Sequence, residues 1–277
     1  MTYELLKKEM LNKELLTVNE IEILLNKYNH ISNNTKSLKY VNNNILPIKI
    51  GNDKIGDDTA IINMSTCLNC YSFKMGYCNA NCYGKSIQCF RKNSLLFGMA
   101  SEIMFHKLTY NEIKKQVVPY CINNNIDYLR FNEFGDMSSI DDFNKANKLA
   151  KQLEKHNIIT YLYTNNKELS IDKLINSHIT VNFSYDTERD DTKETEIIDK
   201  KDIKEVIKDN NCIVCSGKCF NCSYCKNKKD LRKVKFVRHG KGYAKIEMQL
   251  KQVLTVKELN NLIGNKYIDY GLFLKQK

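Results

Sequence analysis

The chain lacks the features that would direct it to a membrane or to the cell exterior. Its first residues, MTYELLKKEMLNKELL, are charged throughout and contain no signal-peptide core. No apolar run is long enough to span a bilayer. The five histidines are spread singly, and none pairs with another at metal-ligand spacing. We therefore expect a cytoplasmic protein with no membrane partner and with ordinary histidines.

Proline and tryptophan are also scarce, with two and none in 277 residues. Together with abundant lysine, asparagine and isoleucine, this composition is typical of AT-rich coding, which adds lysine without functional demand. The chain has 43 Lys and Arg against 32 Asp and Glu, a formal charge of +11. Much of the excess lies in KNKKDLRKVKFVRHGKGYAK, residues 226–245. This basic run is either a solvated face, which the coding bias favours, or a surface for the phosphates of a nucleic acid.

Cysteine, in contrast, is concentrated: all but one of the eleven cysteines fall in two tight groups. The first cysteine group comprises Cys67, Cys70, Cys78, Cys82 and Cys89, and the second comprises Cys212, Cys215, Cys219, Cys222 and Cys225. Core packing requires no particular spacing of cysteines, whereas thiolate ligands must converge on one metal ion or cluster. A long, thiol-rich chain without a signal-peptide core is also a poor match to secreted disulfide frameworks. The grouping therefore predicts metal binding.

The second cysteine group has two, three, two and two residues between successive cysteines. All-cysteine ligation suits both iron–sulfur clusters and zinc, so the segment CIVCSGKCFNCSYC has zinc as an alternative, one tetrahedral ion with a cysteine to spare. Cys121 has no partner nearby in the sequence, and we expect no ligand role for it.

Hydrophobic periodicity predicts helices over residues 1–30 and a polar linker over residues 29–44. Residues 45–65 contain two apolar runs around a Gly/Asn/Asp turn, which predicts a hairpin that ends near Cys67. Helices and strands then alternate. The expected helices are RKNSLLFGMASEIMFHK, residues 109–123, a helix from Ser139 and LSIDKLINS, and the expected strands are IDYLRF, IITYLYT and HITVNFSYD.

This alternation predicts parallel βαβ units, an α/β fold with ligands at the carboxyl ends of the strands. The first cysteine group follows the first strand, and NEFGDM and NNKE follow the next two. Ser184 and Asp186 lie in the last predicted strand. Polar and metal-ligating residues therefore collect on one rim, as in the active site of a barrel or half-barrel.

On these residues the chain resembles the radical SAM superfamily, over about residues 50–225. Cys78-Asn-Ala-Asn-Cys82-Tyr83 is similar to the first two cysteines and the aromatic residue of that superfamily's motif, although Lys85 stands where its third cysteine is usual. LRFNEFGDM, YLYTNN and VNFSYD resemble, in the same order, its later strand ends. The resemblance implies a partial (β/α) TIM-like barrel with N-terminal helices and a cysteine-rich C-terminal tail.

The same resemblance implies a 4Fe–4S cluster with one open iron that binds S-adenosylmethionine (SAM). Cys67, Cys78 and Cys82 are the expected ligands, with Cys70 and Cys89 as further candidates. Gly135 and Asp136 take the place of the segment that meets the SAM amine. Further cofactor contacts are expected from Asn182, Ser184 and Arg130, a mid-strand arginine that needs an anionic partner. The second cysteine group resembles the auxiliary iron–sulfur tail of such enzymes.

The chain is also similar to the phage family called gene product 88. The shared pattern is GNDK before the first strand, Cys67, Cys78, Cys82, Arg91-x-Asn93, a Gly-Asp segment, a Tyr-Thr strand end and a cysteine-rich tail. We expect an N-terminal helical extension over residues 1–40, a radical SAM-like barrel over 41–205, and a cysteine-rich basic region over 206–277. The similarity implies no particular reaction.

Two functions follow from these patterns. The first is an iron–sulfur protein of the radical SAM type, binding SAM and an unassigned substrate. The second is a zinc-binding module without catalysis that contacts nucleic acid through its basic tail. The alternation of strands and helices favours the first, because zinc-ribbon binders rarely contain several βαβ units. The sequence indicates neither the substrate nor the oligomeric state.

Overall fold

The computed structural model describes residues 3–11, 14–28, 30, 36–52, 54–64, 66–78, 82–215, 217, 219 and 222–237. The chain forms two units. The first comprises residues 1–51 and 57–181, and the second comprises residues 52–56 and 182–277. The border falls after Val181, within a strand, whereas the sequence pattern placed boundaries after residues 40 and 205.

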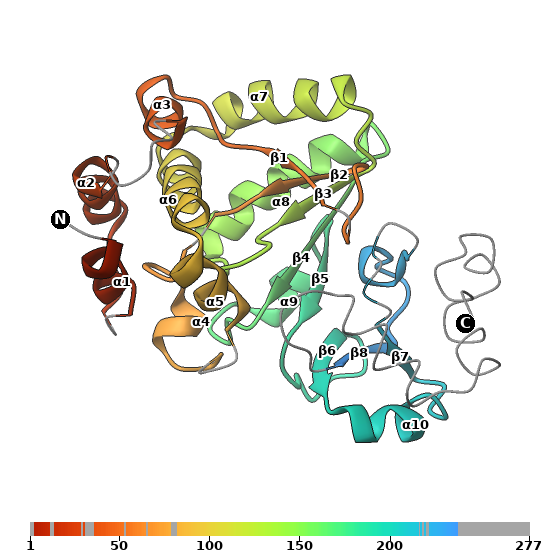
Figure 1. Ribbon diagram of the computed structural model, residues 1–277. Helices are drawn as coiled ribbons and strands as arrows, with labels where there is room; N and C mark the ends of the chain where they lie inside the picture. The colour runs from red at the N-terminus through yellow and green to blue at the C-terminus, as the bar shows by residue number, and fades with distance from the viewer. Residues whose placement is uncertain are drawn as a thin grey trace, which may run out of the picture. The chain divides into compact units, whose positions relative to one another are not determined.

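The first unit is built on a largely parallel sheet (Figure 1). Strands β2 (Thr59–Ile62), β3 (Tyr128–Phe131) and β4 (Ile159–Thr164) pair in parallel, and β5 (Ile179–Phe183) follows β4. The short β1 (Lys49–Ile50) pairs antiparallel with β2, which confirms the predicted hairpin. All four residues of β2 are buried, as expected for a continuous apolar strand in a parallel sheet.

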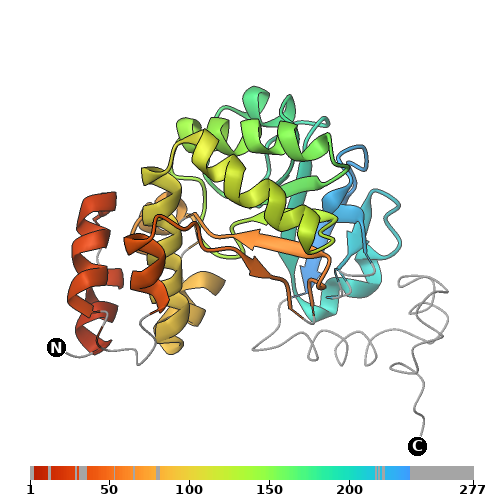
Figure 2. The ribbon, with the colours of Figure 1, turned by 90° about the horizontal axis from the view of Figure 1, so that it is seen from above.

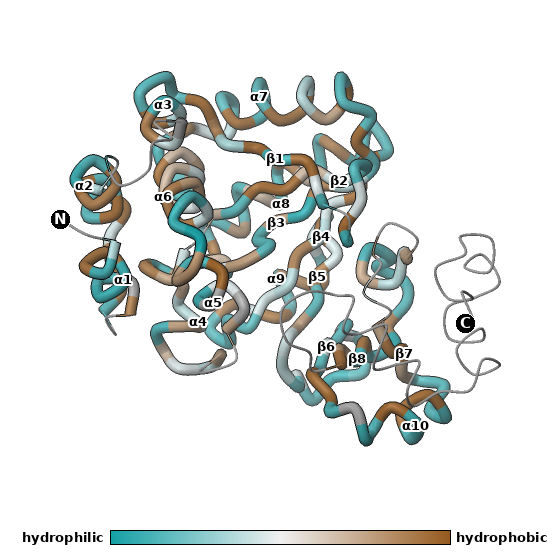
Figure 3. The backbone as a smooth tube through the Cα atoms, viewed as in Figure 1, coloured by the Kyte–Doolittle hydropathy of each residue, from teal (hydrophilic) through white to brown (hydrophobic). Residues whose placement is uncertain are grey.

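Helices connect these strands as the periodicity predicts. They are α6 (Lys92–Lys107), α7 (Tyr110–Asn123), α8 (Ile140–Glu154) and α9 (Ile171–Ile175). Thr109 and Glu112 form a capping box at the start of α7, and the Ser139 hydroxyl accepts from the Asp142 amide at the start of α8. Hydrophobic and hydrophilic residues alternate along α7 (Figure 3), so one face of this helix packs inward.

The N-terminal residues form α1 (Tyr3–Leu11), α2 (Val18–Tyr28) and α3 (Lys36–Asn42); Figure 2 shows α1 and α2 beside α6. The predicted linker over residues 29–44 is therefore wrong at α3. Val41 is buried there, and the Tyr40 ring meets the edge of the Phe97 ring of α6 at 5.9 Å. Packing against α6 stabilises a helix whose own sequence is mostly polar.

The second unit contains β6 (Lys193–Ile198), β7 (Cys212–Val214) and β8 (Lys233–Val237). Both β6 and β7 pair in parallel with β8, and the end of β5 pairs in parallel with β6 at Asn182 and Lys193. Short helical segments complete this unit: η3 (Lys200–Asp202), α10 (Ile203–Val206) and η5 (Tyr224–Lys226).

The α/β class is confirmed. Among the described residues the strand order is β1-β2-β3-β4-β5-β6-β8-β7, an eight-stranded, mostly parallel and open sheet. Across the described residues, the helices are all too short or too polar to cross a membrane.

Candidate metal and cofactor site

The first cysteine group lies in the segment after β2, at the carboxyl end of that strand. Cys67 and Cys70 are buried, and Cys70 precedes the short helix α4 (Tyr71–Lys74). Cys82 is the N-cap of α5 (Tyr83–Phe90), and its Sγ accepts the Lys85 amide at 3.3 Å. A helix N-terminus stabilises a thiolate, because the free amides and the helix dipole favour negative charge there.

The thiols of this group interact with one another. The Cys67 thiol donates to Cys82, and this bond, together with the amides of α5, lowers the pKa of Cys82 to about 7. The same contact and burial raise the pKa of Cys67. Cys70 lies near Cys78 and Cys82, and Cys89, on α5, lies near Cys82. Each of the five predicted cysteines thus interacts electrostatically with at least one other member of the group.

Two buried polar side chains that the sequence analysis missed hold the loop of Cys67 and Cys70. The Glu102 carboxylate, on α6, accepts from the Thr66 amide at 3.1 Å and from the Asn69 side-chain amide at 2.8 Å. Burial raises the pKa of Glu102 to about 8. The Gln88 Oε1 atom accepts from the Cys67 amide at 3.0 Å. The sequence did contain a signal for Glu102, because a glutamate within the apolar run MASEIMF indicates a buried carboxylate that needs partners.

The N-terminal helices also reach this loop. The Leu16 amide donates to the Leu68 carbonyl, between Cys67 and Cys70, at 3.2 Å. The Tyr3 hydroxyl donates to the Gln88 carbonyl. Residues outside the family resemblance therefore support the first cysteine group directly.

The loop that follows β3 packs against the cysteine segment. A Cβ atom added at Gly84 would lie 2.8 Å from the Phe134 Cβ and 3.6 Å from the Gly135 amide, so only glycine allows this approach. Gly135 itself has φ 84°, a conformation that favours glycine. The structure thus brings Cys82 and Gly135, two of the predicted site residues, into one neighbourhood.

Asp136 is buried at the centre of this neighbourhood, 3% exposed. Its carboxylate accepts from the Ser72 hydroxyl at 2.8 Å and from the Asn165 and Met137 amides at 2.7 and 2.8 Å. Burial raises the pKa of Asp136, although these donors oppose the shift. It therefore joins α4, its own loop and the end of β4. The Thr164 side chain is a fourth donor. Since a carboxylate accepts about four hydrogen bonds, direct contact with a SAM amine would compete with these donors.

Asn165, at the end of β4, is a further residue that the sequence analysis did not single out. Its side-chain amide donates to the Cys78 Sγ at 3.2 Å. Burial raises the pKa of Cys78 to about 11, and this bond opposes the rise. The sequence signal for Asn165 was its place in the polar NNKE segment, which follows a predicted strand.

The remaining predicted cofactor contacts make other interactions. Arg130, on β3, is half-buried with its guanidinium 5.1 Å from the centre of the Tyr163 ring. Asn182 and Ser184 belong to the second unit. There the Asn182 side-chain amide donates to the Cys225 carbonyl at 3.0 Å, and the Ser184 hydroxyl accepts from Thr195 at 3.3 Å.

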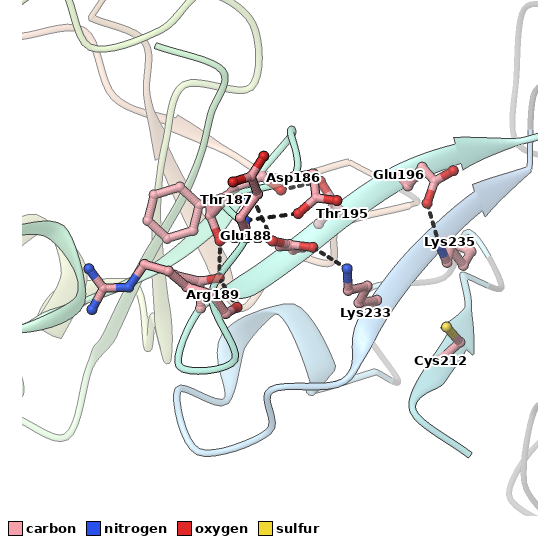
Figure 4. A network of polar contacts seen from close by, with 12 residues as sticks. Asp186, Thr187, Glu188, Arg189, Thr195, Glu196, Cys212, Lys233 and Lys235 are labelled. Atoms are coloured by element: carbon pink, nitrogen blue, oxygen red, sulfur yellow. Dashed lines mark hydrogen bonds and ion pairs between the residues drawn. The ribbon is translucent and has the colours of Figure 1, made fainter. Parts of the chain in front are cut away.

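The second cysteine group also lies in the second unit. Cys215 lies near Cys219 and Cys225, and Cys222 lies near Cys219. Cys212, on β7, is different, because its thiol donates to the Asp209 carboxylate at 3.0 Å. Its charged neighbours include Lys233 and Lys235, and Figure 4 shows it beside these lysines of β8.

The described part of the basic run is largely engaged within the protein. Arg232 pairs with Asp230 at 2.6 Å and Lys233 with Glu194 at 2.6 Å. Lys235 pairs with Glu196 (Figure 4). Residues 238–245 of the run lie outside the described residues, and nucleic-acid binding by the run stays a prediction.

Across the described residues, no three His, Cys, Asp or Glu side chains are already grouped closely enough to hold a metal ion. Comparisons with family models, curated proteins and solved structures found no match. The fit to a metal centre therefore depends on the donor set, in which soft thiols lie near one another beside helix amides and a buried amide donor.

Proposed function

We propose that this chain is an iron–sulfur protein of the radical SAM type, with the first unit forming a partial (β/α) barrel. Cys67, Cys78 and Cys82 would hold a 4Fe–4S cluster, with Cys70 and Cys89 close by. The observation that carries the proposal is the junction of this cysteine segment with the Gly135–Asp136 loop at Gly84. Three thiolate ligands leave one iron for SAM, and the bound cluster supplies an electron for cleavage of the sulfonium bond.

The residues of the chain have separate tasks in this proposal. Glu102 and Gln88 fix the backbone around Cys67 before any metal binds, since each bonds an amide of that loop. Asp136 holds Ser72 and Asn165 in place, and its buried negative charge favours a cationic ligand nearby. Asp136 therefore acts as a positioning residue, and the substrate remains unassigned.

The second cysteine group holds an auxiliary metal centre in this proposal. The competing function is a zinc-binding module that contacts nucleic acid. The engagement of Arg232, Lys233 and Lys235 in internal ion pairs weighs against it, because these charges are already partly neutralised.

The test begins with anaerobic purification. We expect brown protein with iron and sulfide at roughly four each per cluster. Addition of SAM to the reduced protein should shift the EPR signal of the first cluster. Asp136→Asn should weaken the shift and retain the iron, because the change removes charge and keeps shape. Colourless protein that carries zinc alone after reconstitution would exclude the proposal, and an EPR signal indifferent to SAM would exclude its SAM part.

A further inference from the structure

Two lysines are buried beside the second cysteine group, which is unusual for a side chain that carries a charge. Lys193, on β6, is 3% exposed and Lys226, in η5, is 4% exposed. Lysine is almost never fully buried unless an anionic partner compensates its charge. Both lysines lie near Cys222, and Lys193 also lies near Cys225.

The Asp230 carboxylate only partly compensates the buried charge of Lys193. The Lys193 ammonium donates to the backbone carbonyl of Asp230. The Asp230 carboxylate is bound by Arg232, whose Nε and terminal nitrogen lie 3.0 and 2.6 Å from its two oxygens. Asp230 is therefore shared with a second cation. The thiols of Cys222 and Cys225 supply the missing negative charge once they are deprotonated, which is the form that binds metal.

A third lysine and two backbone contacts complete this environment. Lys54 lies near Cys215, whose amide donates to the Lys235 carbonyl at 2.8 Å. The Cys219 amide donates to the Lys54 carbonyl at 2.7 Å. Cys215 and Cys219 are thereby attached to β8 and to the segment of residues 52–56, both within the second unit.

Cys212 does not share this environment. Its thiol donates to the Asp209 carboxylate at 3.0 Å, and a neighbouring carboxylate opposes formation of a thiolate. Its neighbouring lysines are also less available, because Lys233 pairs with Glu194 and Lys235 with Glu196. The fifth cysteine is thus separated from the other four by charge as well as by position.

We propose that Cys215, Cys219, Cys222 and Cys225 form a closed tetrathiolate metal centre, that Lys193 and Lys226 are its buried counter-charges, and that Cys212 is not a ligand. Four thiolates around a divalent zinc ion, or around a four-iron core of equal formal charge, leave two net negative charges. Two buried ammonium groups balance them. Because all ligands are protein thiolates, this centre has no open position for a substrate.

The inference rests on the metal assignment of the second cysteine group in the proposed function. It is tested in a Cys78→Ala, Cys82→Ala background, so that loss of the first site does not affect the readout. We expect this protein to retain about one zinc ion or about four irons with sulfide. Metal analysis and the visible spectrum distinguish these two forms.

In that background, Cys212→Ser should leave the metal content unchanged, and Cys215→Ser should abolish it. Lys193→Met should release the metal to a chelator roughly 10-fold faster or more, the usual range for a residue that supports metal ligands. Lys193→Arg should restore retention, and the exposed Lys229→Met is the matched control. Absence of metal in the background protein, equal loss in Cys212→Ser and Cys215→Ser, or unchanged release from Lys193→Met would each overturn the inference.

Discussion

The two cysteine groups contain the same kind of side chain but differ in the buried polar groups beside them. Buried carboxylates support the first group: Asp136 lies near Cys70 and Cys78, and Glu102 bonds the loop of Cys67. Buried lysines lie beside the second group. A carboxylate environment suits a centre that must receive a cationic ligand, whereas an ammonium environment suits a centre whose negative charge is complete. Ligand identity alone would not distinguish the two groups.

The largest expected effect tests whether the first cysteine group binds iron. Cys82→Ala should lose essentially all iron of the first cluster, because it removes a helix-capping thiolate and a partner of Cys67. Iron and sulfide analysis of the anaerobic protein measures this loss. Cys121→Ala is the matched control, since burial alone raises the pKa of that thiol to about 12 and it is a core residue. Equal iron loss in both variants would indicate general destabilisation instead.

The buried Glu102 beside the first cysteine group should make the stability of the protein depend on pH. Its pKa is raised from 4.5 to about 8 in the folded protein, so the folded state binds the proton more tightly than the unfolded state. The contribution of Glu102 to the free energy of unfolding should therefore be most favourable below about pH 4.5. It should fall with rising pH up to about pH 8, by at most ~1.4 kcal/mol per pH unit. Urea unfolding of metal-free protein across this window measures the slope.

Glu102→Gln should remove the Glu102 contribution to that slope and leave the contribution of Asp136, because the amide cannot ionise and keeps an oxygen for the Thr66 amide. A slope that is the same in Glu102→Gln and in the wild-type protein would contradict this prediction. The expected difference is a few kcal/mol at the alkaline end of the window.

The smallest expected effect concerns Asn165. Asn165→Ala removes the N–H···S bond to Cys78, which stabilises added negative charge on the sulfur ligand. The midpoint potential of the first cluster should become more negative, while its iron content stays unchanged. Asn176→Ala, at an exposed asparagine that bonds only its own helix, is the control. A redox titration in which both variants match the wild type would exclude this role.

Much of the fold follows from regular hydrophobic patterns. The strand IDYLRF and the helix predicted over residues 109–123 lie where the residue pattern places them. The helix α5 was missed, because the cysteine segment has ligand spacing in place of an apolar period. The helix α3 was missed because its stability comes from α6, a contact that the local sequence does not encode.

Only those residues of the candidate site that belong to a local sequence pattern could be predicted. The cysteines were singled out because metal ligands usually cluster in sequence, and Asp136 because its segment resembles the one that meets the SAM amine in the radical SAM superfamily. Glu102 bonds Thr66 across 36 positions of the chain, and no local pattern indicates such a partner. Cys212 matches the ligand spacing as well as its neighbours do, and its bond to Asp209 is a contact that no spacing pattern indicates.

The contacts made by the N-terminal residues have a consequence for the sensitivity of the protein to oxygen. The Leu16 amide bonds the Leu68 carbonyl and the Tyr3 hydroxyl bonds the Gln88 carbonyl, so this part of the chain is attached to the cysteine segment. The oxidation of a cysteine thiolate follows its exposure. A chain shortened to begin at residue 45 would keep every cysteine and still lose these contacts. If the proposed iron–sulfur cluster is bound, we expect the shortened protein to bleach sooner in air, although all its cysteines are kept.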